Sequence, residues 1–324
     1  MCLYYQVEGG QLVIVGVYVD DLLATGTDAA AVDRFFVKLG SLPIKDLGTA
    51  NRFLGMRVKI DNSGGYVLDQ AEAIGELLHD SALLTETKVQ GAPTIKTLRY
   101  LIDSLLWIAR CTRPDIALAV HKATRQTHQP RLHDMKLAKR IARYLKGTRD
   151  CKLRMEPEKH LEVKIQLEAY SDADFVAKKS DRKSLTGGII HLNGMLVSWT
   201  SKKQGGVSLS TMETEFVAAS EQARELLGIR EMLNEIGKPP ALPMVLHVDN
   251  QAALKQLAGE ASSLKAKHID ARTNFVCDFA RRGYIVSQYV RSEQQLADLL
   301  TKALDAVKLA ALCEMIGLDK DGKS

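Results

Sequence analysis

Residues 163–304 constrain the fold most, because expected strands and helices alternate there in a fixed order. Alternating apolar residues predict a strand over Val163–Tyr170, and the Asn193-Gly194 dipeptide predicts a hairpin of strands 184–192 and 195–199. An amphipathic helix over 212–236, strands over 244–248 and 284–290, and helices over 251–258, 268–281 and 293–304 complete the pattern. These alternating strands and helices predict an α/β domain.

The first half of the chain carries a different pattern. An apolar strand over Leu12–Val19 precedes Asp20-Asp21 and a second apolar run, which predicts a β-hairpin with two aspartates at its tip. A helix is expected over 28–39, and three more over 98–110, 115–126 and 133–146. The whole chain is therefore expected to be α+β.

The charges are unevenly distributed. The formal net charge of +5 hides a stretch, residues 88–154, that holds 16 Lys and Arg against 4 Asp and Glu. Within it, a run of cations lies at helical spacing, which is typical of a solvated helix face or of contacts to phosphates. We expect these cations to bind nucleic acid: Lys136, Lys139, Arg140, Arg143 and Lys146.

Several classes of protein are disfavoured by composition. No apolar run approaches the ~20 residues that span a bilayer, and the first ten residues lack the basic start and cleavage site of a secretory signal. The five cysteines are scattered and form no CxxC pair, which favours reduced thiols in an intracellular protein over a zinc site.

Four acids occupy positions that packing alone explains poorly. Asp172 and Asp249 follow expected strands, Glu213 lies in the first turn of the long helix, and Asp298 lies in a later helix. Carboxylates that converge at one sheet edge repel each other unless divalent cations lie between them. Two such ions, about 3.5–4 Å apart, would activate a water and stabilise the leaving oxygen of a phosphodiester.

Each acid also has a structural interpretation. Ser210 to Glu213 is a capping box, and Asp249 could cap the helix that follows it. Asp172 could belong to a turn, and Asp298 could be a solvated helix position. Only the ordered set favours a catalytic site.

Several strings of the C-terminal half resemble the ribonuclease H domain of copia-type LTR retrotransposon polyproteins. They come in the family's order over about residues 163–305. The strings are Tyr170-Ser171-Asp172-Ala173-Asp174, Leu209-Ser210-Thr211-Met212-Glu213-Thr214-Glu215-Phe216, Asp249-Asn250-Gln251, Lys267-His268-Ile269-Asp270 and Glu293-Gln294-Gln295-Leu296-Ala297-Asp298-Leu299-Leu300-Thr301-Lys302.

The resemblance implies an Mg²⁺-dependent enzyme, with Mn²⁺ as the alternative ion, that cuts the RNA strand of RNA–DNA hybrids. It implies two ions held by Asp172, Glu213, Asp249 and Asp298. Glu213 is preferred to Glu215 because it lies nearer the expected strand edge, and the two cannot share a helix face. Glu215, Asp174 and His268 remain accessory candidates.

The N-terminal half resembles the reverse transcriptase of the same polyproteins. Tyr18-Val19-Asp20-Asp21 resembles the active-site hairpin of the palm, and Thr112-Arg113-Pro114-Asp115 and Arg143-Tyr144-Leu145-Lys146-Gly147 resemble thumb and connection segments. Only 19 residues precede Asp20, with Glu8 as their sole acid. We therefore expect a truncated palm and the start of the thumb over 1–87, with vestigial Asp20 and Asp21 and no DNA polymerase activity of its own, and a basic helical connection over 88–160. The resemblance implies a ribonuclease H-like α/β domain with a mixed five-stranded sheet over 161–324.

The expected partner is an RNA–DNA hybrid, with other retrotransposon polyprotein chains as further candidates and no membrane. A cytoplasmic particle and the nucleus stay open as locations. Two rival functions stay open as well: a non-catalytic nucleic-acid-binding remnant, and a subunit that completes a reverse transcriptase with another chain.

Overall fold

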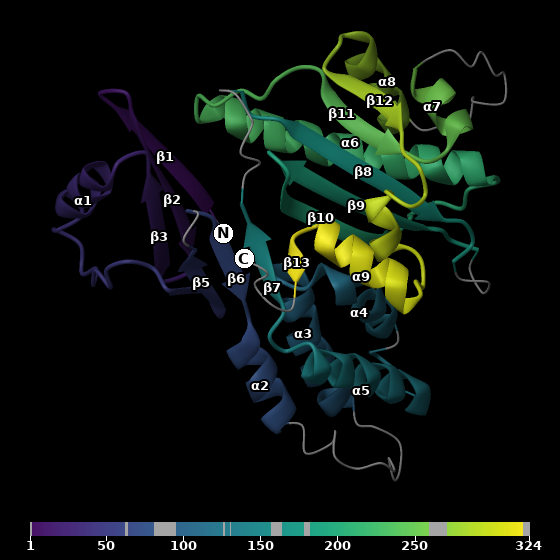
Figure 1. The fold of residues 1–324 in the computed structure, drawn as a ribbon, viewed down its shortest axis with the longest axis horizontal. Coiled ribbons are helices and arrows are strands. Elements are labelled where there is room, and N and C mark those ends of the chain that lie inside the picture. Colours follow the sequence, from purple (N-terminus) through teal and green to yellow (C-terminus); the bar gives the residue numbers. More distant parts are fainter. Residues whose placement is uncertain are drawn as a thin grey trace.

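The computed structural model describes residues 2–61, 64–80, 95–125, 127–129, 131–156, 164–177, 182–258 and 271–319. These residues form a mixed α+β fold with separate sheets at the N-terminal and C-terminal ends of the chain (Figure 1). The α+β fold class predicted from the sequence is confirmed.

The first sheet is an antiparallel meander of β1 (Cys2–Glu8), β2 (Gln11–Tyr18) and β3 (Asp21–Gly26), followed by α1 (Ala29–Lys38). Tyr18 pairs with Asp21, so Val19 and Asp20 make the two-residue turn, with Val19 at a φ of 52°. The Asp28 side chain accepts a hydrogen bond from the Ala30 N–H and caps α1. The predicted hairpin with aspartates at its tip is confirmed.

A second sheet joins distant parts of the chain in the order β13-β7-β6-β5-β4. Its strands are β4 (Arg52–Phe53), β5 (Met56–Ile60), β6 (Tyr66–Asp69), β7 (Lys152–Met155) and β13 (Leu318–Asp319). Each of the three predicted regions contributes at least one strand, so the C-terminal end of the described chain returns to the first half (Figure 1).

The basic region forms the three expected helices, as α3 (Ile95–Cys111), α4 (Ala117–Thr124) and α5 (Leu132–Gly147), with the 3₁₀ helix η2 (Pro114–Ile116) between α3 and α4. A further helix, α2 (Ala71–Asp80), precedes this region. Leu98, Leu105 and Leu145 are fully buried in their shared core. Arg113 is also fully buried, because it pairs with Asp115 through two hydrogen bonds of 2.9 and 2.7 Å and donates to the Thr148 carbonyl.

The C-terminal sheet has the order β10-β9-β8-β11-β12. Its strands are β8 (Leu167–Asp174), β9 (Leu185–Leu192), β10 (Met195–Lys203), β11 (Met244–Val248) and β12 (Ile285–Tyr289). β8, β9 and β10 are antiparallel neighbours, and β11 runs parallel to both β8 and β12. The mixed five-stranded sheet predicted for this part of the chain is confirmed.

Helices follow the strands much as the periodicity predicts. They are α6 (Thr211–Glu235), α7 (Gln251–Leu257), α8 (Ala271–Arg281), the 3₁₀ helix η4 (Leu296–Leu300) and α9 (Ala306–Met315). The helix predicted over 293–304 is wrong in type and length, because the chain there forms only the short η4. None of the described helices is both long and apolar enough to cross a membrane.

The two faces of this sheet meet different partners. α6 covers one face, where Ala219, Ala223 and Leu226 pack with Leu167 and Ala169. On the other face, the Trp199 Nε1 of β10 donates to the Ala109 carbonyl of α3 at 2.8 Å. The helical region therefore packs directly against the C-terminal sheet.

Candidate functional site

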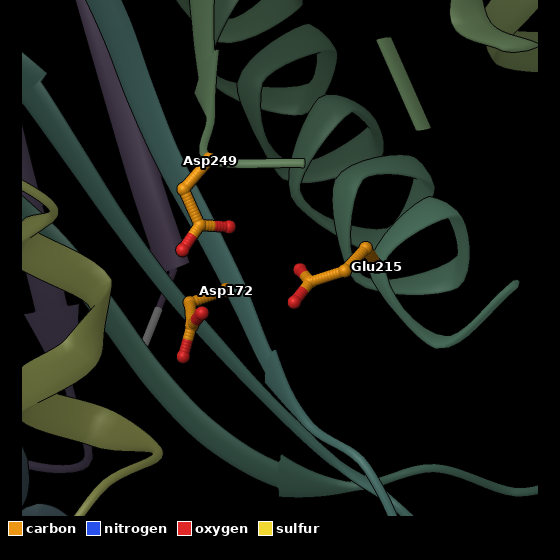
Figure 2. A group of neighbouring side chains, drawn as sticks. All are labelled: Asp172, Glu215 and Asp249. Atoms are coloured by element: carbon orange, nitrogen blue, oxygen red, sulfur yellow. The ribbon is translucent and has the colours of Figure 1, made fainter. Parts of the chain in front are cut away.

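Three carboxylates converge at one end of the C-terminal sheet. Asp172 lies in β8, Asp249 directly follows β11, and Glu215 lies in the second turn of α6; one carboxylate oxygen from each lies within 4.8 Å of the others. Figure 2 shows the three side chains pointing into a common space. The register explains the convergence, because Val248 pairs with Ser171 on the parallel strand β8, so the next residues, Asp249 and Asp172, are neighbours.

Glu215, and not Glu213, joins this group, which corrects the preference drawn from the sequence. Glu213 is half-buried, and its Oε2 accepts from the Leu209 N–H at 2.7 Å. Its own N–H donates to Ser210 Oγ at 3.1 Å, so Glu213 takes part in capping the start of α6. Helix periodicity could have predicted that Glu215 faces the sheet. Ala219 is buried against the sheet, and it lies four residues after Glu215 on the same face of α6.

Asp298 faces the same region from η4 but is held by two lysines. It is 1% exposed, and it accepts from Lys302 Nζ at 2.6 Å and from Lys308 Nζ at 2.5 Å. Lys302 also donates to Asp172 at 2.9 Å and lies 3.9 Å from Asp249. The Lys302 ammonium thus lies between Asp298 and the other two aspartates.

Sequence reasoning did not assign Lys302 and Thr301 to the site, although both belong to a string that resembles the family. The Thr301 hydroxyl donates to Asp172 Oδ2, opposite the oxygen that Lys302 contacts. Lys302 follows Asp298 by four residues, which is the spacing of an ion pair on one helix turn. This spacing is the sequence signal that could have assigned Lys302 to the site.

The pKa values of the acids are raised, because the site disfavours their ionised forms. Burial, together with Asp172 and Asp249, raises the pKa of Glu215 to about 9. Burial raises the pKa of Asp172 to about 6 against the opposing effect of Lys302, and it also raises the pKa of Asp249. Burial alone would lower the pKa of Lys302, but Asp172 and Asp298 raise it above its ordinary value.

This donor set fits a divalent cation. Glu215 Oε2 is buried and has no hydrogen-bond partner among the described residues, so a ligand oxygen is left unsatisfied. Mg²⁺ and Mn²⁺ prefer carboxylate oxygens, and a cation between these three would offset their mutual repulsion. Asp172, Glu215 and Asp249 are therefore the residues that could hold a metal ion.

The remaining predicted residues lie elsewhere. Asp174 ends β8 and is half-buried, outside the group of three, and His268 lies outside the described residues. Asp20 and Asp21 are exposed at the tip of the β2–β3 hairpin, in a different sheet.

The predicted basic face of α5 is mostly, but not wholly, at the surface. Lys136, Arg140, Arg143 and Lys146 are exposed. Lys139 is only 7% exposed, so the prediction that it lies on the solvated face is wrong. The packing of α5 against α2, α3 and α4 explains its burial.

The comparisons with known proteins identify relatives of this chain. The family "Reverse transcriptase (RNA-dependent DNA polymerase)" matches residues 1–96. A retrovirus-related Pol polyprotein from transposon RE1 of Arabidopsis thaliana is 31% identical over 97% of this chain. The chain belongs to the copia-type retrotransposon polyproteins. It spans 22% of the length of that relative.

Another relative is matched over most of its own length. An uncharacterized mitochondrial protein of Arabidopsis thaliana is 32% identical over 64% of this chain and 91% of its own length. Among solved structures, the N-terminal ribonuclease H domain of a Mycobacterium tuberculosis protein covers 46% of this chain and 97% of its own. Its sequence identity is 11% and its TM-score 0.33.

Proposed function

We propose that this chain is an Mg²⁺-dependent ribonuclease that cuts the RNA strand of RNA–DNA hybrids. The observation that carries the proposal is the group of the buried Asp172 and Glu215 with the half-buried Asp249 at one end of the mixed five-stranded sheet. Membership of the copia-type polyproteins, with a reverse transcriptase match over residues 1–96, supports a substrate that reverse transcription produces.

The three carboxylates would hold the metal, and Asp298 would complete the set from η4. When bound, two divalent ions supply an activated water and stabilise the leaving oxygen of the phosphodiester. Thr301 and Lys302 fix both oxygens of Asp172, which orients that carboxylate before any ion arrives. Lys302 also donates to Asp298, which is almost fully buried, and so offsets the charge of that carboxylate.

Recognition of the RNA strand would rely on shape. The A-form geometry and 2′-hydroxyl groups of a hybrid distinguish it from B-form DNA with little dependence on base sequence. The exposed α5 cations Lys136, Arg140, Arg143 and Lys146 are proposed to contact its phosphates.

The test is cleavage of an end-labelled RNA–DNA hybrid in Mg²⁺. Asp172→Asn and Asp249→Asn are expected to abolish cleavage, and Glu215→Gln to reduce it by at least about 100-fold, since one metal ligand is lost. Glu213→Gln is the matched control, two residues away in the same helix, and is expected to retain activity. An intact hybrid after incubation with folded wild-type protein refutes the proposal, and so does equal loss of activity in the two Glu→Gln variants.

A second candidate is a subunit role beside another polyprotein chain. It is favoured by β1, a sheet-edge strand on which Leu3, Tyr4, Tyr5 and Val7 are all exposed. Asp20 and Asp21 would then contribute to a polymerase site with groups of the partner. Primer extension by this chain alone, and by this chain with a longer polyprotein chain, tests it; no gain with the longer chain rejects the subunit role.

A further inference from the structure

The Lys302 ammonium lies among three carboxylates of the candidate site. Its Nζ is 2.9 Å from Asp172 Oδ1, 2.6 Å from Asp298 Oδ1 and 3.9 Å from Asp249 Oδ2. We propose that Lys302 is a resident cation that competes with the divalent ion for Asp172, leaves this carboxylate when the ion binds, and so sets the affinity of the site for metal. The inference rests on the proposed function, because it concerns the regulation of that metal site.

Lys302 and a divalent ion compete for the same carboxylate. The Thr301 hydroxyl donates to Asp172 Oδ2 and Lys302 donates to Asp172 Oδ1, so both oxygens of this buried side chain already have a donor. Asp172 is also one of the three acids that could hold a metal ion. A divalent ion on this carboxylate repels an ammonium beside it, whereas the neutral Thr301 hydroxyl can stay. Lys302 is therefore the donor that has to move.

The exposure of the side chains shows which partner can move. The side chains of Asp172 and Asp298 are 0% and 2% exposed, whereas that of Lys302 is 41% exposed. Lys302 follows the last turn of η4, and a lysine carries its charge on a flexible four-carbon stem. The ammonium can therefore turn to solvent while the strand and η4 stay in place.

A second lysine keeps Asp298 paired when Lys302 leaves. Lys308 Nζ lies 2.5 Å from Asp298 Oδ2, the oxygen that Lys302 does not contact. Loss of one partner from a buried ion pair is costly when it leaves a charge unpaired, and Lys308 prevents this for Asp298. Within the part of the chain that the structure describes, Lys308 forms an ion pair with Asp298 and with neither Asp172 nor Asp249. Lys308 is thus a fixed partner of one acid, and Lys302 is the exchangeable one.

The alternative role for Lys302 is a permanent bridge between η4 and β8. Other hydrogen bonds already hold η4 on the sheet. Gln295 Nε2 donates to the Ser171 carbonyl at 3.0 Å, and Ser201 Oγ donates to the Leu300 carbonyl at 2.8 Å. The cation is therefore not needed to fix η4, and its contacts with three acids are better explained by the charge of the metal-free site.

The first experiment follows Lys302 in the wild-type protein, without substrate. Acetic anhydride acetylates accessible amines, and mass spectrometry of the digested protein gives the rates at Lys302 and Lys308 with and without Mg²⁺. If Mg²⁺ raises the released fraction of Lys302 from about a tenth to nearly all molecules, its acetylation accelerates about tenfold. Lys308 is the internal reference, and its rate is expected to stay unchanged because its partner Asp298 remains.

The second experiment measures Mn²⁺ binding, again without substrate, from the electron paramagnetic resonance signal of the free ion. Lys302→Met keeps most of the stem but removes the competing charge, and it is expected to tighten binding about tenfold, because the site no longer waits for a minor released state. Lys308→Met is the matched control, since it removes the same charge from the same acid. It is not expected to tighten binding, because Lys302 then becomes the remaining lysine partner of Asp298.

The proposal is supported if Mg²⁺ accelerates acetylation of Lys302 and if only Lys302→Met tightens Mn²⁺ binding. It is overturned if Mg²⁺ leaves the acetylation of Lys302 unchanged, or if Lys302→Met binds Mn²⁺ no more tightly than Lys308→Met. The acetylation needs no variant, so it decides the matter even if Lys302→Met does not fold. A wild-type protein that releases Lys302 in Mg²⁺ but leaves the hybrid intact refutes the proposed nuclease alone, and cleavage without release of Lys302 refutes the exchange alone.

Discussion

Replacing Glu215 by Gln is expected to stabilise the metal-free protein, and to do so more strongly at pH 7 than at pH 5. The pKa of Glu215 is raised to about 9 by burial and by the neighbouring Asp172 and Asp249, against a value of 4.5 in the unfolded chain. The folded state therefore keeps a proton that the unfolded state releases. The contribution of this proton to the free energy of unfolding is fully present below pH 4.5 and is lost as the pH rises toward 9.

The magnitude follows from the two pKa values. Linkage between 4.5 and 9 destabilises the wild type, relative to a neutral side chain, by about 1 kcal/mol at pH 5 and about 3 kcal/mol at pH 7. The amide of Gln has its own burial penalty, but that penalty does not change with pH. The decisive quantity is therefore the increase in the stability difference from pH 5 to pH 7, which should be about 2.5 kcal/mol.

Urea unfolding in EDTA at the two pH values measures this difference. Glu213→Gln is the control, because it keeps an oxygen that can accept from the Leu209 N–H and should change stability by less than about 1 kcal/mol. Added Mg²⁺ should stabilise the wild type and leave Glu215→Gln unchanged, since a ligand that binds only the folded state raises its stability. A Glu215→Gln effect of equal size at pH 5 and pH 7 would refute the reasoning.

Two further predictions concern how the site is held in place. Trp199→Phe removes the hydrogen bond to the Ala109 carbonyl and should lower the free energy of unfolding by about 1 kcal/mol in urea titrations; an unchanged midpoint would show that this contact adds nothing. Gly187→Ala places a Cβ 2.9 Å from the Ala297 carbonyl, so η4 must shift at a cost of about 1–3 kcal/mol, together with a loss of hybrid cleavage. Gly205→Ala, where no atom lies within 4 Å of the added Cβ, is the control, and equal melting temperatures for the two variants would contradict the prediction.

The strands and helices that carry the site were largely predictable from the sequence. The apolar runs around Asp20-Asp21, the Asn193-Gly194 turn and the stripe of α6 each specify a local structure, because period and turn chemistry act over a few residues. Asn193 and Gly194 indeed adopt φ values of 50° and 77°. Asp172 and Asp249 could be proposed together because both follow expected strands, and the structure places Asp172 near the end of β8 and Asp249 directly after β11.

The sequence by itself determined the α+β class, the order of the elements and the basic character of the helical region. It did not determine which glutamate joins the aspartates, because Glu213 and Glu215 have similar local signals and only the packing of α6 on the sheet orients one of them inward. The neutralisation of Asp298 by Lys302 and Lys308 also required the tertiary structure. Burial decides these roles, because a carboxylate removed from water must find a cation, a hydrogen-bond donor or a proton, and burial exists only in the folded chain.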